Sequence, residues 1–173
     1  GMCALSWPGT DQAYGRVANE RSIPHCLSTA ASTSLEDCRR LAGENAWFQL
    51  YISNVDAGWA LVDRAEKAGY EHLILTVDTP LISRRRRELR RGFKVPFVFG
   101  PSQVLDFALH PQWSIATLLN GAPRFGNNDP TADANAQAFS RGQSRGGIEW
   151  DFLAELRDRW KGKLIVKGVL SAD

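Results

Sequence analysis

The sequence predicts an α/β fold in which parallel strands alternate with helices and gather around one mouth of a barrel. One observation is that strand-like and helix-like segments alternate with short connections, which is typical of a parallel sheet with helical crossovers. The other is that three apolar runs, at 46–51, 73–80 and 164–168, end in polar residues. Because functional groups gather at the carboxyl ends of barrel strands, we expect these ends to line one site.

Apolar periodicity and end signals predict four strands and four helices. The strands are expected at 23–27, 46–51, 73–77 and 164–168, and the helices at 10–21, 35–43, 55–68 and 150–160. Thr10 and Ser34 are expected N-caps, and acidic residues follow Ser34 in the first turn of its helix. Gly43, Gly69 and Gly162 mark helix ends.

A long segment, 84–147, interrupts this alternation within a single partial domain that spans 1–173. It joins an arginine-rich run, an apolar and aromatic middle, and a stretch rich in Gly, Asn and Ser. A connection of this length is well above the usual loop length, so we expect a lid, an interaction segment or disorder. An eight-stranded barrel takes ~250 residues. With four countable strands, the chain is expected to be a slice of a longer barrel, N- and C-terminally incomplete.

Composition limits the class of protein. The 21 basic and 19 acidic residues give a net charge of +2, which is too small to indicate nucleic-acid binding by itself. No run reaches the ~18 to 20 apolar residues that a spanning helix requires. Cys3, Cys26 and Cys38 show no metal-ligand spacing, so we expect reduced thiols, a cytoplasmic setting and no metal site.

Three polar residues near the strand ends are candidate catalytic groups. Tyr51 offers a phenolic hydrogen bond to a substrate oxygen, and Asp78 can orient a neighbouring histidine base. Arg85 or one of its neighbours can clamp a carboxylate in a bidentate fork. Each has a structural alternative: a core residue for Tyr51, a turn or cap before Thr-Pro for Asp78, and a solvated face for the arginines.

Four further residues form a candidate cofactor set. Ser28, Gln49 and Thr76 are neutral donors and acceptors of the kind that bind the edge of a planar ring. Lys167, at the end of an apolar strand, can place a positive charge against an electron-rich cofactor atom. No catalytic role is expected for the three histidines.

Four motifs, taken in order, resemble the FMN-dependent α-hydroxy acid dehydrogenases and oxidases, which include glycolate oxidase, lactate oxidase, and the respiratory L-lactate and mandelate dehydrogenases. The motifs are 27–34, 47–51, 75–80 with Arg85, and 166–168. The resemblance runs through nearly the whole chain. It implies part of a TIM (β/α)8 barrel, with FMN lying over the strand ends.

The same resemblance implies a role for each of the seven candidates. Ser28, Gln49 and Thr76 would bond the pyrimidine edge and N5 side of the flavin, and Lys167 would stabilise the reduced, anionic ring near N1 and O2. The implied catalytic set places Tyr51 at the substrate, Asp78 beside the catalytic histidine and Arg85 near the active site.

The long segment resembles the corresponding loop of membrane-associated lactate and mandelate dehydrogenases, through residues 110–113 and 119–121. The implied enzyme oxidises a small L-2-hydroxy acid and passes electrons from FMN to a quinone-like acceptor. An aromatic, apolar segment at 96–120 flanked by arginines can bind a bilayer interface, here the inner face of the cell membrane. Packing on the barrel as a lid is the alternative.

Some parts of the family pattern are absent from residues 1–173. These are the Ser-Asn-His-Gly-Gly-like segment with the histidine base and the Gly-rich phosphate loops. The isolated chain is therefore expected to be inactive. The second hypothesis is a non-catalytic half-barrel that self-associates or complements a partner fragment, because four strands leave two edges and an apolar face. A third, weaker one is nucleic-acid binding through 84–91.

Overall fold

A single four-stranded sheet organises the protein, for which a computed structural model describes residues 1–52, 55–78, 100–121, 124–127 and 150–171. The strands lie in the order β1-β2-β3-β4, and all neighbouring pairs are parallel. Their bounds are His25–Ser28 for β1, Ala46–Leu50 for β2, His72–Thr76 for β3 and Lys163–Lys167 for β4. The predicted parallel α/β arrangement with about four strands is confirmed.

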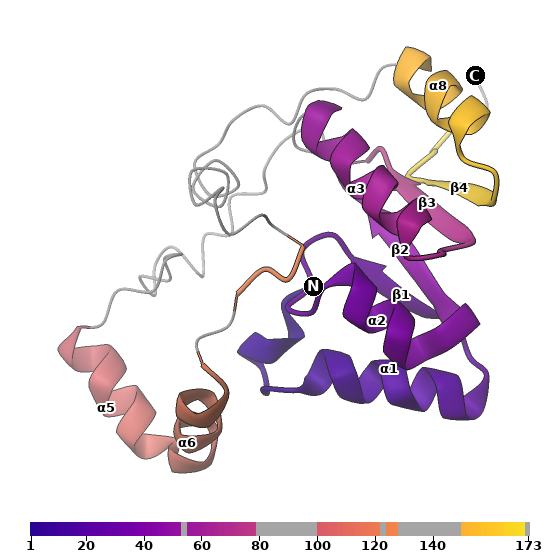
Figure 1. Ribbon diagram of the computed structural model, residues 1–173. Helices are drawn as coiled ribbons and strands as arrows, with labels where there is room; N and C mark the ends of the chain where they lie inside the picture. Colours follow the sequence, from indigo (N-terminus) through magenta and orange to yellow (C-terminus); the bar gives the residue numbers. More distant parts are fainter. Residues whose placement is uncertain (53–54, 79–99, 122–123, 128–149, 172–173) are drawn as a thin grey trace.

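Helices alternate with these strands (Figure 1). Their bounds are Cys3–Leu5 (η1), Thr10–Arg21 (α1), Leu35–Ala42 (α2), Gly43–Asn45 (η2), Val55–Lys67 (α3), Pro101–Leu109 (α5), Pro111–Asn120 (α6) and Trp150–Arg159 (α8). Four of them, α1, α2, α3 and α8, match predicted helices within about a residue at each end. The helices α5 and α6 lie in the long segment, where none was predicted. Each begins with a proline at its first position, which is the signal that marks them.

Local chemistry explains where the helices begin and end. Ser34 is the N-cap of α2 as predicted, and its Oγ accepts the amide of the third residue beyond it at 3.1 Å. The predicted cap at Thr10 is wrong, because the cap of α1 is Gly9, whose φ of +83° suits glycine. Gly43 and Gly69 follow α2 and α3 with positive φ, as expected for helix ends.

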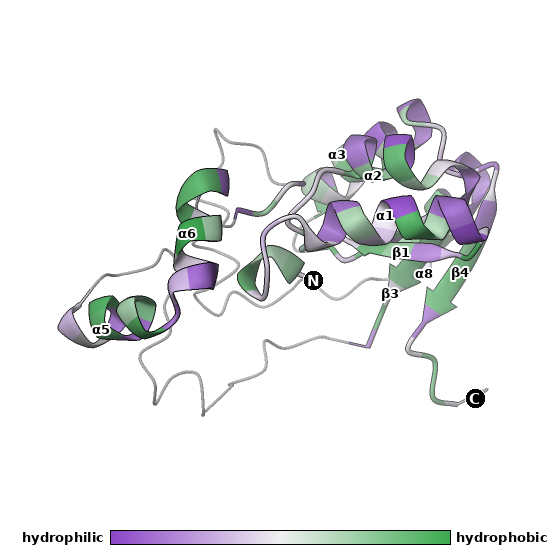
Figure 2. Ribbon diagram, turned by 90° about the horizontal axis from the view of Figure 1, so that it is seen from below, coloured by the Kyte–Doolittle hydropathy of each residue, from purple (hydrophilic) through white to green (hydrophobic). Residues whose placement is uncertain are grey.

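The buried core lies between the sheet and the helices. Figure 2 shows α1, α2 and α3 on one side of the strands. On that side, Leu27, Phe48 and Leu73 stand in register on adjacent strands and are at most 1% exposed. Burying a side chain of this size stabilises the fold by about 1.5–3 kcal/mol. The helix α8 extends this layer beside α3, because the rings of Trp59 and Phe152 lie 4.7 Å apart.

The opposite face of the sheet carries its more exposed side chains. Successive side chains of a strand point to opposite faces, so residues that alternate with the core positions lie here. Cys26 and Lys163 are exposed on this face, while Trp47 and His72 are half-buried with their rings stacked at 4.6 Å. In the described part of the chain, this face therefore offers the polar groups.

Candidate functional site

The four cofactor candidates lie at one edge and on one face of the sheet. Ser28, Thr76 and Lys167 are the last residues of their strands, and Gln49 is next to the last of β2. Ser28 pairs in register with Gln49, and Thr76 pairs with Lys167. Partners in register share a face, and Gln49 stands two positions below the register of Thr76, so all four side chains point away from the helices. The structure thus brings this set together.

A direct hydrogen bond joins two members of the set. Gln49 donates through Nε2 to Oγ1 of Thr76 at 2.7 Å. Thr76 is 5% exposed, so its hydroxyl is held against the sheet. A hydroxyl that accepts in this way keeps its own proton for donation, and the amide oxygen of Gln49 keeps its acceptor capacity.

Ser28 sits in a turn that is fastened to the end of β2. Its Oγ accepts the amide of Ala30 at 3.2 Å. Thr29 donates to the carbonyl of Gln49 through both its amide and its hydroxyl, at 3.0 and 2.8 Å. The same hydroxyl accepts the amide of Tyr51 at 2.9 Å. Sequence reasoning missed Thr29, although its place directly after Ser28 is the signal for this link.

Lys167 and Asp78 form an ion pair at the far end of the same edge. Their Nζ and Oδ2 atoms lie 2.6 Å apart. The close approach depends on Gly168, whose φ is +108° and where a Cβ atom would lie 2.3 Å from the Cβ of Asp78. The sequence had suggested a cofactor role for one partner and a catalytic role for the other. Their contact couples the two charges electrostatically.

The remaining two candidates are placed less fully. Tyr51 directly follows β2, is half-buried, and lies next to the carboxyl edge. Arg85 lies outside the described residues, so its predicted place near the active site stays a prediction. No group of three His, Cys, Asp or Glu residues that could hold a metal ion occurs in the described ranges.

Comparison with known proteins decides the family. All of residues 1–173 match the family described as FMN-dependent dehydrogenase. The chain belongs to this family. The chain is 38% identical over 177 residues to (S)-mandelate dehydrogenase of Pseudomonas putida. This match covers 100% of this chain but 45% of that protein. The chain is 32% identical over 166 residues to an L-lactate dehydrogenase of Pectobacterium atrosepticum, covering 91% of this chain and 42% of that one.

Solved structures of FMN-dependent dehydrogenases and related oxidases share the fold. (S)-mandelate dehydrogenase, described as a monotopic membrane protein, gives a TM-score of 0.86 at 38% identity, over 96% of this chain and 45% of that one. A mandelate oxidase with a C4a-OH-FMN adduct gives a TM-score of 0.64 at 25% identity, over 95% of this chain and 38% of that one. The predicted family, its flavin cofactor and the partial barrel are confirmed. The chain spans less than half the length of these relatives.

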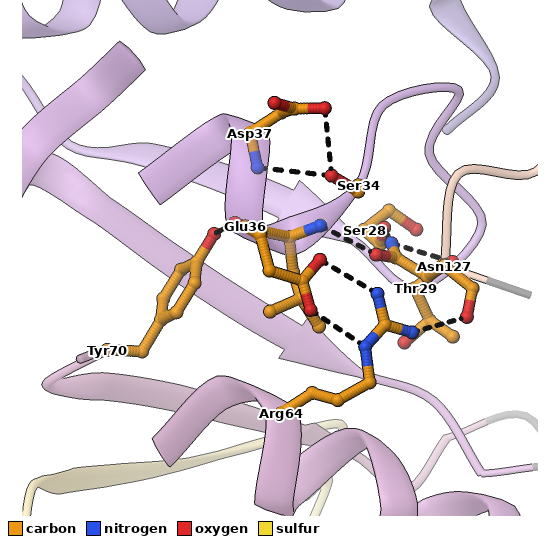
Figure 3. A network of polar contacts seen from close by, with 9 residues as sticks. Ser28, Thr29, Ser34, Glu36, Asp37, Arg64, Tyr70 and Asn127 are labelled. Carbon is orange, nitrogen blue, oxygen red and sulfur yellow. Dashed lines mark hydrogen bonds and ion pairs between the residues drawn. The ribbon is translucent and has the colours of Figure 1, made fainter. Parts of the chain in front are cut away.

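One network in this FMN-dependent dehydrogenase chain was not predicted from the sequence. Figure 3 shows Asn127 against the loop between β1 and α2, with Arg64 and Glu36 beside it. Arg64 binds both carboxylate oxygens of Glu36 at 2.8 Å and donates to the carbonyl of Asn127 at 2.9 Å. These hydrogen bonds lower the pKa of Glu36. Tyr70 closes the other side by donating to the carbonyl of Leu35 at 2.7 Å.

Proposed function

We propose that this chain supplies the flavin-edge part of a dehydrogenase that oxidises a small L-2-hydroxy acid, such as lactate or mandelate, to the 2-keto acid. The observation that carries the proposal is the shared strand edge formed by Ser28, Gln49, Thr76 and Lys167. Neutral hydrogen-bonding groups beside one cation complement a planar ring whose pyrimidine edge gains negative charge on reduction. The residues present therefore fit FMN, which accepts two electrons when bound.

Each side chain has a specific task in this proposal. Gln49 and Thr76, joined to one another, present a fixed donor and acceptor pair to the ring edge. Lys167 holds positive charge where the reduced ring is anionic, and Asp78 keeps that ammonium in place while its carboxylate orients a histidine base. Tyr51 donates a hydrogen bond to the substrate, and Arg85 binds near its carboxylate.

The 173 residues alone are proposed to be inactive towards hydroxy acids. His25 and His72 begin β1 and β3, so both lie at the amino edge of the sheet, and His110 lies between α5 and α6. The described structure thus places none of the three histidines at the carboxyl edge, where a base would be needed. Substrate-dependent dye reduction by the chain by itself, with lactate or mandelate, would refute this part of the proposal.

Flavin binding tests the central claim directly. Purified chain is titrated with FMN, and quenching of flavin fluorescence gives the dissociation constant. We expect saturable binding that Gln49→Leu weakens. Trp47 lies on the same strand and the same face as Gln49 but two positions nearer the amino edge, so Trp47→Phe serves as the matched control. Equal affinity in the wild type and in Gln49→Leu would contradict the proposed site.

A peripheral membrane contact through the 96–120 segment is part of the proposal. In its described part, exposed apolar side chains gather on α5 and α6: Val104, Leu105, Leu109, Ile115, Leu118 and Leu119. Figure 2 shows α6 largely in hydrophobic colours and away from the sheet. None of the described helices combines the length and apolar character needed to cross a bilayer. A helix pair that binds the bilayer interface fits this pattern. In the proposal it binds the inner face of the cell membrane, and the quinone-like acceptor lies in the same membrane.

Self-association of a half-barrel is the second candidate function. The apolar side chains of Ile165, Val169 and Leu170, in and just after β4, are exposed. Burying them against a second copy or a partner fragment would remove this surface from water and pair the edge strand. Light scattering tests this candidate, because a stable monomer contradicts self-association.

A further inference from the structure

We propose that Asn127 is a positioning residue for the flavin edge. It holds residues 28–35, the β1–α2 loop, in one conformation. In this conformation Ser28 faces the site and the loop fixes the end of β2. This inference rests on the proposed FMN site and deepens it. Asn127 itself belongs to the segment that follows α6, and the hydrogen bonds of its side chain go to backbone groups of this loop.

The side chain of Asn127 bridges both ends of the β1–α2 loop. Its Nδ2 donates to the carbonyls of Ser28 and Thr29 at 3.3 and 3.2 Å, and its Oδ1 accepts the amide of Leu35 at 2.8 Å (Figure 3). The residue is 4% exposed, so water does not replace these bonds. Both protons of one amide group and its oxygen are thus used on three backbone groups at the two ends of one loop.

Two of these backbone groups, the Leu35 amide and the Thr29 carbonyl, depend on Asn127, whereas the Ser28 carbonyl also accepts the amide of Ala31 at 3.0 Å. The amide of Leu35 is at the first position of α2, where a helix offers no internal acceptor. The carbonyl of Thr29 lies just past the end of β1, where the ladder with β2 stops. A buried backbone group without a partner is costly, so the loop keeps its shape only while Asn127 is in place.

Asn127 is in turn fixed from its other side. Arg64 donates to its carbonyl and is anchored through two bonds to Glu36 in the first turn of α2. The amide of Gly126 donates to the carbonyl of Ala31 at 2.8 Å, again within the loop. A Cβ atom on Gly126 would lie 2.2 Å from the loop backbone, so the backbone of this segment packs directly against that of the loop.

The loop passes this constraint to the site. Thr29 binds the carbonyl of Gln49 twice and accepts the amide of Tyr51, so a shift of the loop moves the end of β2. Ser28 is itself the start of the loop. The side chains proposed to meet the flavin and the substrate at this end of the sheet therefore depend on Asn127 through backbone contacts.

Asn127→Asp is the sharpest test, because it keeps the volume and replaces both donated protons with an oxygen that faces two carbonyls. Asn19→Asp is the matched control, since Asn19 is exposed on α1 and makes the same change of charge. Two milder variants guard against loss of folding. Asn127→Ser keeps one hydroxyl donor, and Arg64→Gln releases the Asn127 carbonyl while leaving its amide group intact.

Two measurements separate the positioning role from the site itself. Hydrogen exchange without flavin reports the amides of the loop, and FMN titration with spectroelectrochemistry reports the dissociation constant and midpoint potential of bound flavin. We expect Asn127→Asp to speed hydrogen exchange in the loop about tenfold and to raise the FMN dissociation constant about tenfold. Each change corresponds to the loss of a buried hydrogen-bonding partner. We also expect a changed midpoint potential, an intermediate effect of the milder variants, and no effect of Asn19→Asp.

Other results would overturn the inference. Unchanged loop exchange in a folded Asn127 variant would show that the residue does not hold the loop. Faster exchange with wild-type FMN affinity and wild-type midpoint potential would show a structural role only, and would equally reject positioning. Failure of the wild-type chain to bind FMN would instead reject the proposed function and the flavin part of this inference, while the exchange data would still decide whether Asn127 holds the loop.

Discussion

A single hydrogen bond sets the relative orientation of Gln49 and Thr76, and it makes Thr76 the most direct residue to change. Thr76→Val keeps the shape and removes the hydroxyl, so the Gln49 amide loses its acceptor. We expect the FMN dissociation constant to rise about tenfold, which corresponds to one hydrogen bond. Fluorescence titration measures it. Thr10→Val also removes a side-chain hydroxyl bond, to the carbonyl of Trp7, and should leave the affinity unchanged.

Lys167 and Lys163 occupy opposite ends of β4 and point to the same face, so they form a natural pair of test and control. Lys167→Gln removes the charge proposed to stabilise the reduced ring and breaks the ion pair with Asp78. We expect the two-electron midpoint potential of bound FMN to fall by on the order of 30 mV, or tenfold in the equilibrium constant. Lys163→Gln should not shift it. Equal potentials in both variants would remove Lys167 from the proposed site.

At the scale of elements, the strand ends and caps were predictable because their causes are local. Ser34 and the glycines act within a few residues of where they stand, and the apolar runs identify the strands. The start of β1 was expected at 23 but lies at His25, because Pro24 has no amide for the ladder. Asn127 was not predictable in this way. The partners of its side chain are 92 to 99 residues away in the sequence, and no local pattern indicates such a contact.

Tyr70 links α2 to the strand layer and gives the fold a predictable response to alkali. Burial raises its pKa well above the ordinary value, and burial also raises the pKa of Cys38 to about 11. A folded-state pKa above the unfolded value of about 10 means that the contribution to stability is complete below pH ~10 and is lost as the pH rises further. We therefore expect the free energy of unfolding to decline above pH ~9 through Cys38, whose ordinary pKa is about 9, and above pH ~10 through Tyr70 as well.

Tyr70→Phe isolates this effect when Cys38 is replaced by Ala in both backgrounds. The variant loses the bond to the Leu35 carbonyl, which costs about 1 kcal/mol near neutral pH. It should then lose less stability than its parent above pH ~10. Urea unfolding from pH 7 to 11 measures both, with Tyr14→Phe as the exposed control. Parallel pH curves for Tyr70→Phe and its parent would contradict the assignment.

Gly168 connects the end of β4 to the Asp78 ion pair, and its substitution separates two kinds of strain. Gly168→Ala forces a side chain into φ +108° and against the Cβ of Asp78. Gly121→Ala meets only the first problem, because φ is +82° and nothing lies within 4 Å of its Cβ. We expect both to destabilise the fold, Gly168→Ala more strongly and by about 1–3 kcal/mol. Only Gly168→Ala should also shift the flavin potential, because it displaces Asp78 from Lys167.

At the scale of the whole molecule, the sheet separates two surfaces with different requirements. Its helix-covered face is closed by apolar side chains, whereas the carboxyl edge and the opposite face carry the polar set. The pair α5 and α6 stands outside this arrangement and is tied to the N-terminal segment by the Trp113 indole, which donates to the carbonyl of Leu5 at 3.2 Å. Sequence composition located this apolar segment. It did not reveal two helices, whose local signal is the proline at the start of each.

The proposed membrane contact is assigned to the helix pair α5 and α6. Leu118 and Leu119 are 82% and 81% exposed, and burying each in a bilayer interface stabilises binding by about 1.5–3 kcal/mol. We expect the wild-type chain to float with vesicles that contain anionic lipid, and the double variant Leu118→Ser, Leu119→Ser to lose at least about tenfold in partition. Val17→Ser removes an exposed apolar residue from α1 and should float like the wild type. If the double variant floats as well as the wild type, α6 does not enter the interface, and packing of this segment as a lid becomes the better explanation of its apolar surface.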